Sequence, residues 1–102
     1  MILRVAGRSV PRAVAGAIAH NVRKGEPVEL QAVGAEAVNQ AVKAIALAVN
    51  YLAGDGIAIA CVPRMMEVPV SPYHPEVRRG ICLKILVGKL EEVKEDSHGT
   101  AT

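Results

Sequence analysis

The chain of 102 residues contains no phenylalanine and no tryptophan, and its only aromatic side chains are two tyrosines. A core without large rings must be built from Ala, Val, Ile and Leu, whose small side chains let helices lie close to a sheet. The same scarcity argues against a surface that stacks the bases of single-stranded nucleic acid on aromatic rings. Hydrophobic residues nevertheless make up 51% of the chain, which indicates a folded globule rather than a disordered polymer.

Cysteine and histidine are also scarce, and their positions do not indicate chemistry. Cys61 and Cys82 lie in apolar segments without CxxC spacing, so we predict reduced, buried thiols. The three histidines are isolated from one another, and no pair has the spacing of metal ligands. Paired carboxylates, a Ser/His/Asp set and an activated cysteine are not indicated by spacing either. We therefore expect a protein that is not an enzyme and needs no metal or cofactor.

No apolar run approaches the roughly 20 residues that span a bilayer. Lys43, Asn50 and Asp55 interrupt the best candidate, and the first residues, MILRVAGRS, lack the layout of a signal peptide. We expect a cytoplasmic protein that does not contact a membrane.

Charge is unevenly distributed along the chain. Residues 91–102, EEVKEDSHGTAT, hold four acids and one lysine, a net charge of −3, whereas residues 1–90 hold eleven basic and six acidic residues, a net charge of +5. We predict one domain over residues 1–90 and a disordered acidic tail over residues 91–102. A basic body is compatible with a nucleic-acid partner, and it is also compatible with an ordinary solvated surface.

The first half of the chain predicts two strand–helix units. Ile2–Ala6 is expected to be a strand, followed by a helix over residues 10–23 with Ser9 as its N-cap, and Gly16 is interpreted as a close-packing position against the sheet. Alternation predicts a second strand over residues 28–33, and after Gly34 a helix over residues 35–52. The predicted buried stripes are Val10, Val14, Ala17, Ile18 and Val22 in the first helix, and Val38, Ala41, Val42, Ile45, Val49 and Leu52 in the second.

The second half predicts two further strands joined by a long arm. The near-continuous apolar run 57–62 is typical of a strand that lies centrally or is covered on both faces, and Pro63 indicates a bulge or an edge beyond it. Residues 65–79 contain three prolines and are interpreted as a long hairpin arm, followed by a strand over residues 80–87. The fold class is α/β, a two-layer β-α-β-α-β-β sandwich with two helices on one mixed four-stranded sheet. The other face of the sheet is expected to be covered by a second copy of the chain.

Three groups of residues are candidates for binding. The turns Gly7-Arg8-Ser9 and Gly34-Ala35 precede helices at one edge of the sheet, where two helix N-termini could hold a phosphate. Glu36 opposes an anion at this place, and both turns are also compatible with a purely structural role as turns and helix caps. The arm carries Arg64, His74, Arg78 and Arg79, which suits a nucleic-acid backbone or a solvated loop. Glu36, Gln40, Lys43, Leu47 and Tyr51 follow one side of the second helix, where we expect a dimer contact.

Two segments carry a resemblance to a known family. RSVPRAVAGAIA and VELQAVGAEAVNQAVKAIALAVNYLA together resemble the stage V sporulation protein S family over about 45 residues of the first half. This resemblance implies a small cytoplasmic bacterial protein linked to developmental regulation. The element order also resembles that of Alba, a dimeric chromatin and RNA-binding protein, although Val33, Ala35 and Glu36 stand where Alba has basic residues.

The two resemblances together imply a dimeric, non-enzymatic regulator that contacts the phosphate backbone of DNA or RNA. The alternative is a module that binds a protein or a small anion and does not touch nucleic acid. The predicted nucleic-acid-binding residues are Arg8, Ser9, Arg12, Gly34, Lys43, Arg64, Arg78 and Arg79.

Overall fold

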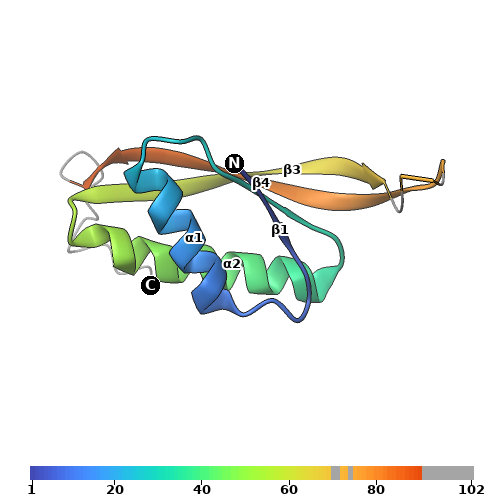
Figure 1. Ribbon diagram of the computed structural model, residues 1–102, viewed down its shortest axis with the longest axis horizontal. Helices are drawn as coiled ribbons and strands as arrows, with labels where there is room; N and C mark the ends of the chain where they lie inside the picture. The colour runs from blue at the N-terminus through green and yellow to red at the C-terminus, as the bar shows by residue number, and fades with distance from the viewer. Residues whose placement is uncertain (70–71, 74, 91–102) are drawn as a thin grey trace, which may run out of the picture.

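The computed structural model describes residues 1–69, 72–73 and 75–90 and has the predicted order of elements (Figure 1). The elements are β1 (Ile2–Val5), α1 (Pro11–Arg23), β2 (Glu29–Ala32), α2 (Ala35–Ala53), β3 (Ile57–Pro69) and β4 (Val77–Lys89). Both helices lie on one side of a mixed four-stranded sheet, so the predicted fold class is confirmed. The predicted acidic tail, residues 91–102, and His74 lie outside the described residues.

The order of strands in the sheet is β1-β2-β4-β3. β1 and β2 are parallel, and β4 lies antiparallel between β2 and β3. The prediction that the apolar run 57–62 is central or covered on both faces is therefore wrong, because β3 is an edge strand and Val62 is 42% exposed. The edge position predicted from Pro63 is confirmed, and β3 continues to pair with β4 through this residue without a bulge.

The core lies between the helices and one face of the sheet. Val28, Leu30 and Ala32 alternate inward as predicted, and Leu83 and Ile85 of β4 join them. Ile57, Ile59 and Cys61 of β3 pack against the same cluster while Ala60 and Val62 face away, which explains an apolar run in a strand covered on one face. Cys82 is buried and Cys61 is half-buried, and both are free thiols.

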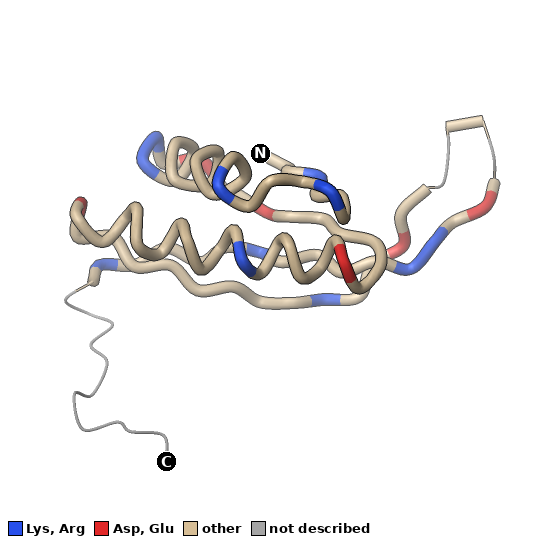
Figure 2. Tube along the Cα trace, turned by 90° about the horizontal axis from the view of Figure 1, so that it is seen from below, with Lys and Arg blue, Asp and Glu red and all other residues tan. Residues whose placement is uncertain are grey.

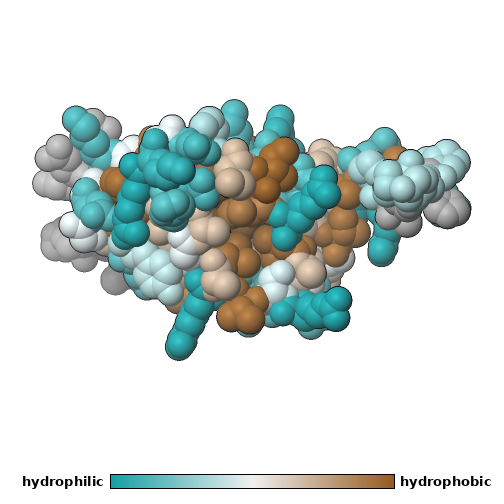
Figure 3. Space-filling model, in the orientation of Figure 1, coloured by the Kyte–Doolittle hydropathy of each residue, from teal (hydrophilic) through white to brown (hydrophobic). Residues whose placement is uncertain are grey.

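The helices are rotated relative to the predicted stripes. The buried positions are Ala15, Ile18, Ala19, Asn21 and Val22 in α1, and Ala37, Ala41, Ala44, Ile45, Ala48 and Leu52 in α2. α2 thus buries alanines and leaves Val42 50% exposed and Val49 39% exposed, and Val10 before α1 is 61% exposed. Small side chains allow a closer approach, so packing favours the alanine side. Apolar surface consequently remains outside on α2. Figure 3 shows an apolar area in the middle of the view, with hydrophilic side chains around it.

The start of α1 differs from the prediction. Val10, not Ser9, is the N-cap residue, and no side chain caps the helix. The Ser9 hydroxyl instead accepts a hydrogen bond of 2.9 Å from the Ala6 amide, and the Ser9 amide donates one of 3.0 Å to the Ala6 carbonyl. Ser9 therefore closes the turn between β1 and α1, and Pro11 at the first helical position needs no partner for an N–H group.

Gly16 is the clearest correction within the helices. It faces solvent in the middle of α1, and a Cβ atom built on it meets nothing within 4 Å, so it is not a close-packing position. Alanine is about 1 kcal/mol more favourable than glycine inside a helix. We expect Gly16→Ala to raise the free energy of unfolding by about that amount, measured by denaturant titration.

Gly25 is the matched control for this substitution. It also has open space around it but adopts φ +77°, where a side chain is strained. Gly25→Ala should lower the free energy of unfolding. A Gly16→Ala protein no more stable than the wild type would contradict this prediction.

Candidate nucleic-acid interface

The structure does not bring the eight predicted nucleic-acid-binding residues together. Arg8 and Ser9 lie in the β1–α1 turn, and Gly34 precedes α2 with φ +93°. Arg12 and Lys43 line a groove between the helices, whereas Arg64, Arg78 and Arg79 belong to the β3–β4 hairpin. The predicted residues therefore fall on different surfaces of the molecule.

The N-terminus of α2 carries a carboxylate of the chain itself, which also contacts the turn before α1. Glu36 lies in the first turn of α2 and packs against Gly7, where an added Cβ would come within 3.0 Å of the Glu36 Oε2 atom. Gln40 donates a hydrogen bond of 3.1 Å from its Nε2 to the Gly7 carbonyl. These contacts hold the β1–α1 turn against α2. The Glu36 charge next to the α2 N-terminus disfavours a phosphate at this place.

The hairpin arm is present as predicted, but its charge is mixed. β3 and β4 pair from Ile57 opposite Lys89 to Pro69 opposite Val77, so the arm is a continuation of the sheet. Arg79 stands opposite Glu67, and residues 64–79 contain three arginines and two glutamates, a net charge of +1 with histidine neutral. Successive residues of a strand point to opposite faces, which places Arg78 and Arg79 on different sides of the arm.

A row of polar side chains crosses the face of the sheet that the helices leave uncovered. The register aligns Arg4 of β1 with Gln31 of β2, Gln31 with Cys82 of β4, and Cys82 with Arg64 of β3. Three strand spacings of about 4.8 Å separate the two arginines across this row. The neighbouring row aligns Ile2, Glu29, Lys84 and Val62. We call these eight residues the open face.

The open face has one acidic side chain, and that carboxylate is already engaged. The Cys82 thiol donates a hydrogen bond of 2.7 Å to Glu29 Oε2, which lowers the pKa of Glu29, and Arg64 and Lys84 add a smaller lowering effect. Burial raises the pKa of the Cys82 thiol, and Glu29 raises it further. Cys82 therefore stays protonated near neutral pH and is a structural donor rather than a nucleophile.

The cations of the open face outnumber its acid by three to one. Arg4, Arg64 and Lys84 are exposed, and Arg78 extends the same face along the arm by strand alternation. Arg4 and Lys84 were not among the residues predicted from the sequence. The signal was available, because each lies between two core residues, Leu3 and Val5 or Leu83 and Ile85, and must therefore point away from the helices.

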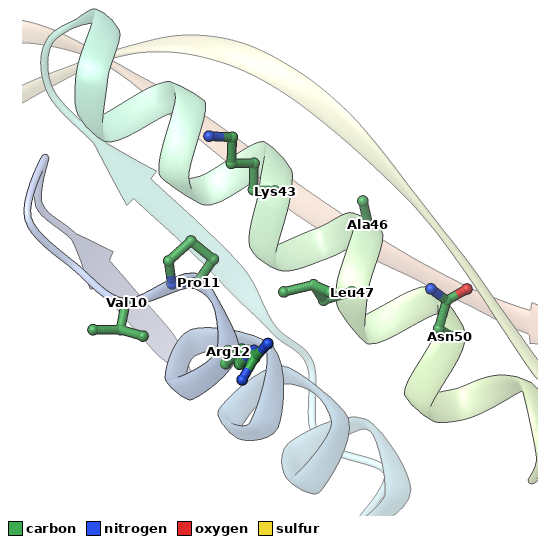
Figure 4. A pocket seen from close by; sticks show the side chains of 7 residues that line it. All are labelled: Val10, Pro11, Arg12, Lys43, Ala46, Leu47 and Asn50. Atoms are coloured by element: carbon green, nitrogen blue, oxygen red, sulfur yellow. The ribbon is translucent and has the colours of Figure 1, made fainter.

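The groove between α1 and α2 is a separate feature of the helical layer (Figure 4). Its volume is about 650 Å³, and Val10, Pro11, Ala46 and Leu47 supply an apolar lining, with Leu47 pointing from α2 toward α1. The other residues that line it are Arg12, Lys43 and Asn50. Arg12 and Lys43 thus share one surface, which lies on the opposite side of the molecule from the open face.

Two further findings bear on the class of protein. Among the described residues, none of the helices is long and apolar enough to cross a membrane. The fold is a two-layer α/β domain with a cationic sheet face and a protruding hairpin. The family model described as stage V sporulation protein S (SpoVS) matches residues 1–87, which include both helices and all but the last two residues of β4. The chain belongs to the stage V sporulation protein S family, as its sequence had suggested.

Proposed function

We propose that this protein binds the phosphate backbone of nucleic acid through the open face of its sheet and the adjoining side of the arm. The observation that supports this proposal most strongly is the placement of Arg4, Arg64, Lys84 and Arg78 on one uncovered surface with a single engaged carboxylate. Phosphate oxygens are the ligands that guanidinium and ammonium groups bind most readily in nucleic acids.

Side chains of the open face favour backbone contact over base recognition. The face has no aromatic ring on which a base could stack. Gln31 is its only side-chain amide, so direct hydrogen bonding to base edges has little support. We therefore propose weak dependence on sequence and strong dependence on salt, as expected for an interface of phosphate contacts.

Residues on the helical side are left out of this proposed interface. Arg12 and Lys43 lie in the groove of the opposite layer, and Arg79 faces the helical side across from Glu67. A nucleic acid lying along the open face does not reach them. Arg8 lies in the turn at the edge of the sheet, and its participation stays a prediction from the Alba resemblance.

A binding titration at two salt concentrations tests the proposal. Fluorescently labelled duplex DNA and an RNA hairpin are each titrated with the full chain, and the slope of log K against log salt is measured. Four neutralised phosphates predict a slope of about −3.6 on duplex DNA, so affinity should fall roughly hundredfold between about 50 and 200 mM salt. Absence of binding at the lower salt concentration would support the alternative, a module that binds a protein or a small anion.

A further inference from the structure

Apolar side chains line the groove between α1 and α2, although water reaches them. Val10 is 61% exposed, Ala46 is exposed, and the half-buried Leu47 points from α2 toward α1 (Figure 4). The volume of about 650 Å³ falls within the range of about 300–1,000 Å³ that is typical of sites for small molecules. A ligand with an apolar body would therefore remove apolar surface from water on both sides of the contact.

The charges that line the groove are of one sign. Arg12 of α1 and Lys43 of α2 are exposed there, and no acidic side chain is among the described residues that line it. The first turn of α1 contains no acidic residue either. Neither cation forms an ion pair or a side-chain hydrogen bond with the part of the chain that the structure describes. Both positive charges are therefore available to an anion.

The acidic residues in and next to α2 do not neutralise these cations. Only two charged residues, Glu36 and Lys43, occur in the 19 residues of α2 (Figure 2). Glu36 lies seven residues before Lys43, or about 10 Å along the helix, and packs against Gly7. Asp55, which follows α2, pairs with Arg23 at 2.8 Å. Both acids are thus engaged away from the groove, which keeps its positive charge.

We propose that this groove binds a small amphipathic carboxylate, a molecule with one anionic head and a flexible apolar chain. The head pairs with Arg12 and Lys43, since a guanidinium can hold a carboxylate through two parallel hydrogen bonds. The chain lies along Leu47 and Ala46. A polyanion fits this groove less well, because its successive charges would lie against Val10 and Leu47. The site is on the opposite layer from the open face and does not depend on nucleic-acid binding.

A second hollow provides an internal comparison. It has a volume of about 480 Å³ between the end of α2 and the start of β3, and its lining includes Val49, Ala53, Ile59 and Leu90. None of the described residues that line it is charged. It would accept an apolar chain whatever the head group. Selectivity for a carboxylate therefore distinguishes binding in the groove from binding to apolar surface in general.

Calorimetric titration of the full chain with four matched ligands tests the proposal. Octanoate has the head and the chain, acetate has the head alone, 1-octanol has the chain with a neutral head, and octylammonium has the chain with the opposite charge. Octanoate should bind at least tenfold more tightly than each of the others, because it alone uses both the cations and the apolar lining. Equal affinity for octanoate and 1-octanol, or no measurable binding of octanoate at millimolar concentration, would overturn the proposal.

Two double variants locate the site. Arg12→Gln with Lys43→Gln removes both cations of the groove and should weaken octanoate binding roughly tenfold, with the affinity for 1-octanol unchanged. Arg4→Gln with Lys84→Gln removes the same charge from the open face and should leave octanoate binding unchanged.

Circular dichroism confirms that both variants are folded. Equal loss of octanoate binding in the two variants, or no loss in the groove variant, would contradict the assignment to the groove. Octanoate binding is measured without nucleic acid, so failure of this proposal is distinguishable from failure of the proposed function.

Discussion

Replacing Arg4, Arg78 and Lys84 together with alanine is expected to flatten the salt dependence of duplex binding by about 2.7 units, since each neutralised phosphate contributes about 0.9. These three cations lie on the open face or on its continuation along the arm, and none of them makes an ion pair within the described residues. Their loss should weaken binding to all sequences alike, because phosphate contacts carry no sequence information. The measurement is the slope of log K against log salt.

A second triple variant provides the control for net charge. Arg12→Ala, Lys24→Ala and Arg79→Ala also remove three positive charges, but from the groove, the turn after α1 and the helical side of the arm. General electrostatic attraction to a polyanion would be reduced equally in both proteins. We expect this control to retain most of the slope. Equal flattening in the two variants would show that binding depends on net charge and not on the open face.

The alternation of β1, β2 and β4 explains why much of the fold could be predicted from the sequence. Leu30 lies between Glu29 and Gln31, and Leu83 is followed by the exposed Lys84, so a period of two admits one orientation of each strand. The same alternation places Arg4 and Lys84 on the uncovered side, so both cations could have been predicted there from the sequence. The order of strands in the sheet was harder to predict from the sequence, because β3 and β4 are both rich in apolar residues. Only the pairing of β4 with β2 shows that β4 is central and β3 is at the edge.

The rotation of α2 could not be predicted because its sequence offers two apolar sides. Val42 and Val49 are more hydrophobic than Ala44 and Ala48, so a hydrophobicity pattern places the valines inside. The structure buries the alanines, whose small side chains allow α2 to approach the elements packed against it more closely. Proximity of residues distant in the sequence, such as Glu36 against Gly7 or Cys82 beside Glu29, likewise depends on packing that local patterns do not specify.

Gly80 marks the place where the arm leaves the body of the sheet, and it is buried against the end of β2. A Cβ atom on this residue would lie 2.8 Å from the Ala32 carbonyl oxygen and 2.9 Å from Cγ2 of Val33. The Val33 side chain has some freedom to move, but the carbonyl belongs to a strand paired with β4. Displacement of this carbonyl would pull Ala32, the last residue of β2, away from its partner Ile81 in β4.

We expect Gly80→Ala to lower the free energy of unfolding by about 1–3 kcal/mol, the usual cost of forcing extra volume into a packed site. Chain entropy works in the opposite direction, because alanine restricts the unfolded chain more than glycine, so any measured loss reflects the steric contact. Denaturant titration gives the change, and Val33→Ala in the same chain identifies the obstacle. If the Ala32 carbonyl causes the loss of stability, removal of the Val33 methyl groups restores little stability to the Gly80→Ala protein. Full recovery in the double variant would assign the contact to Val33, and a neutral Gly80→Ala would mean that β2 yields without cost.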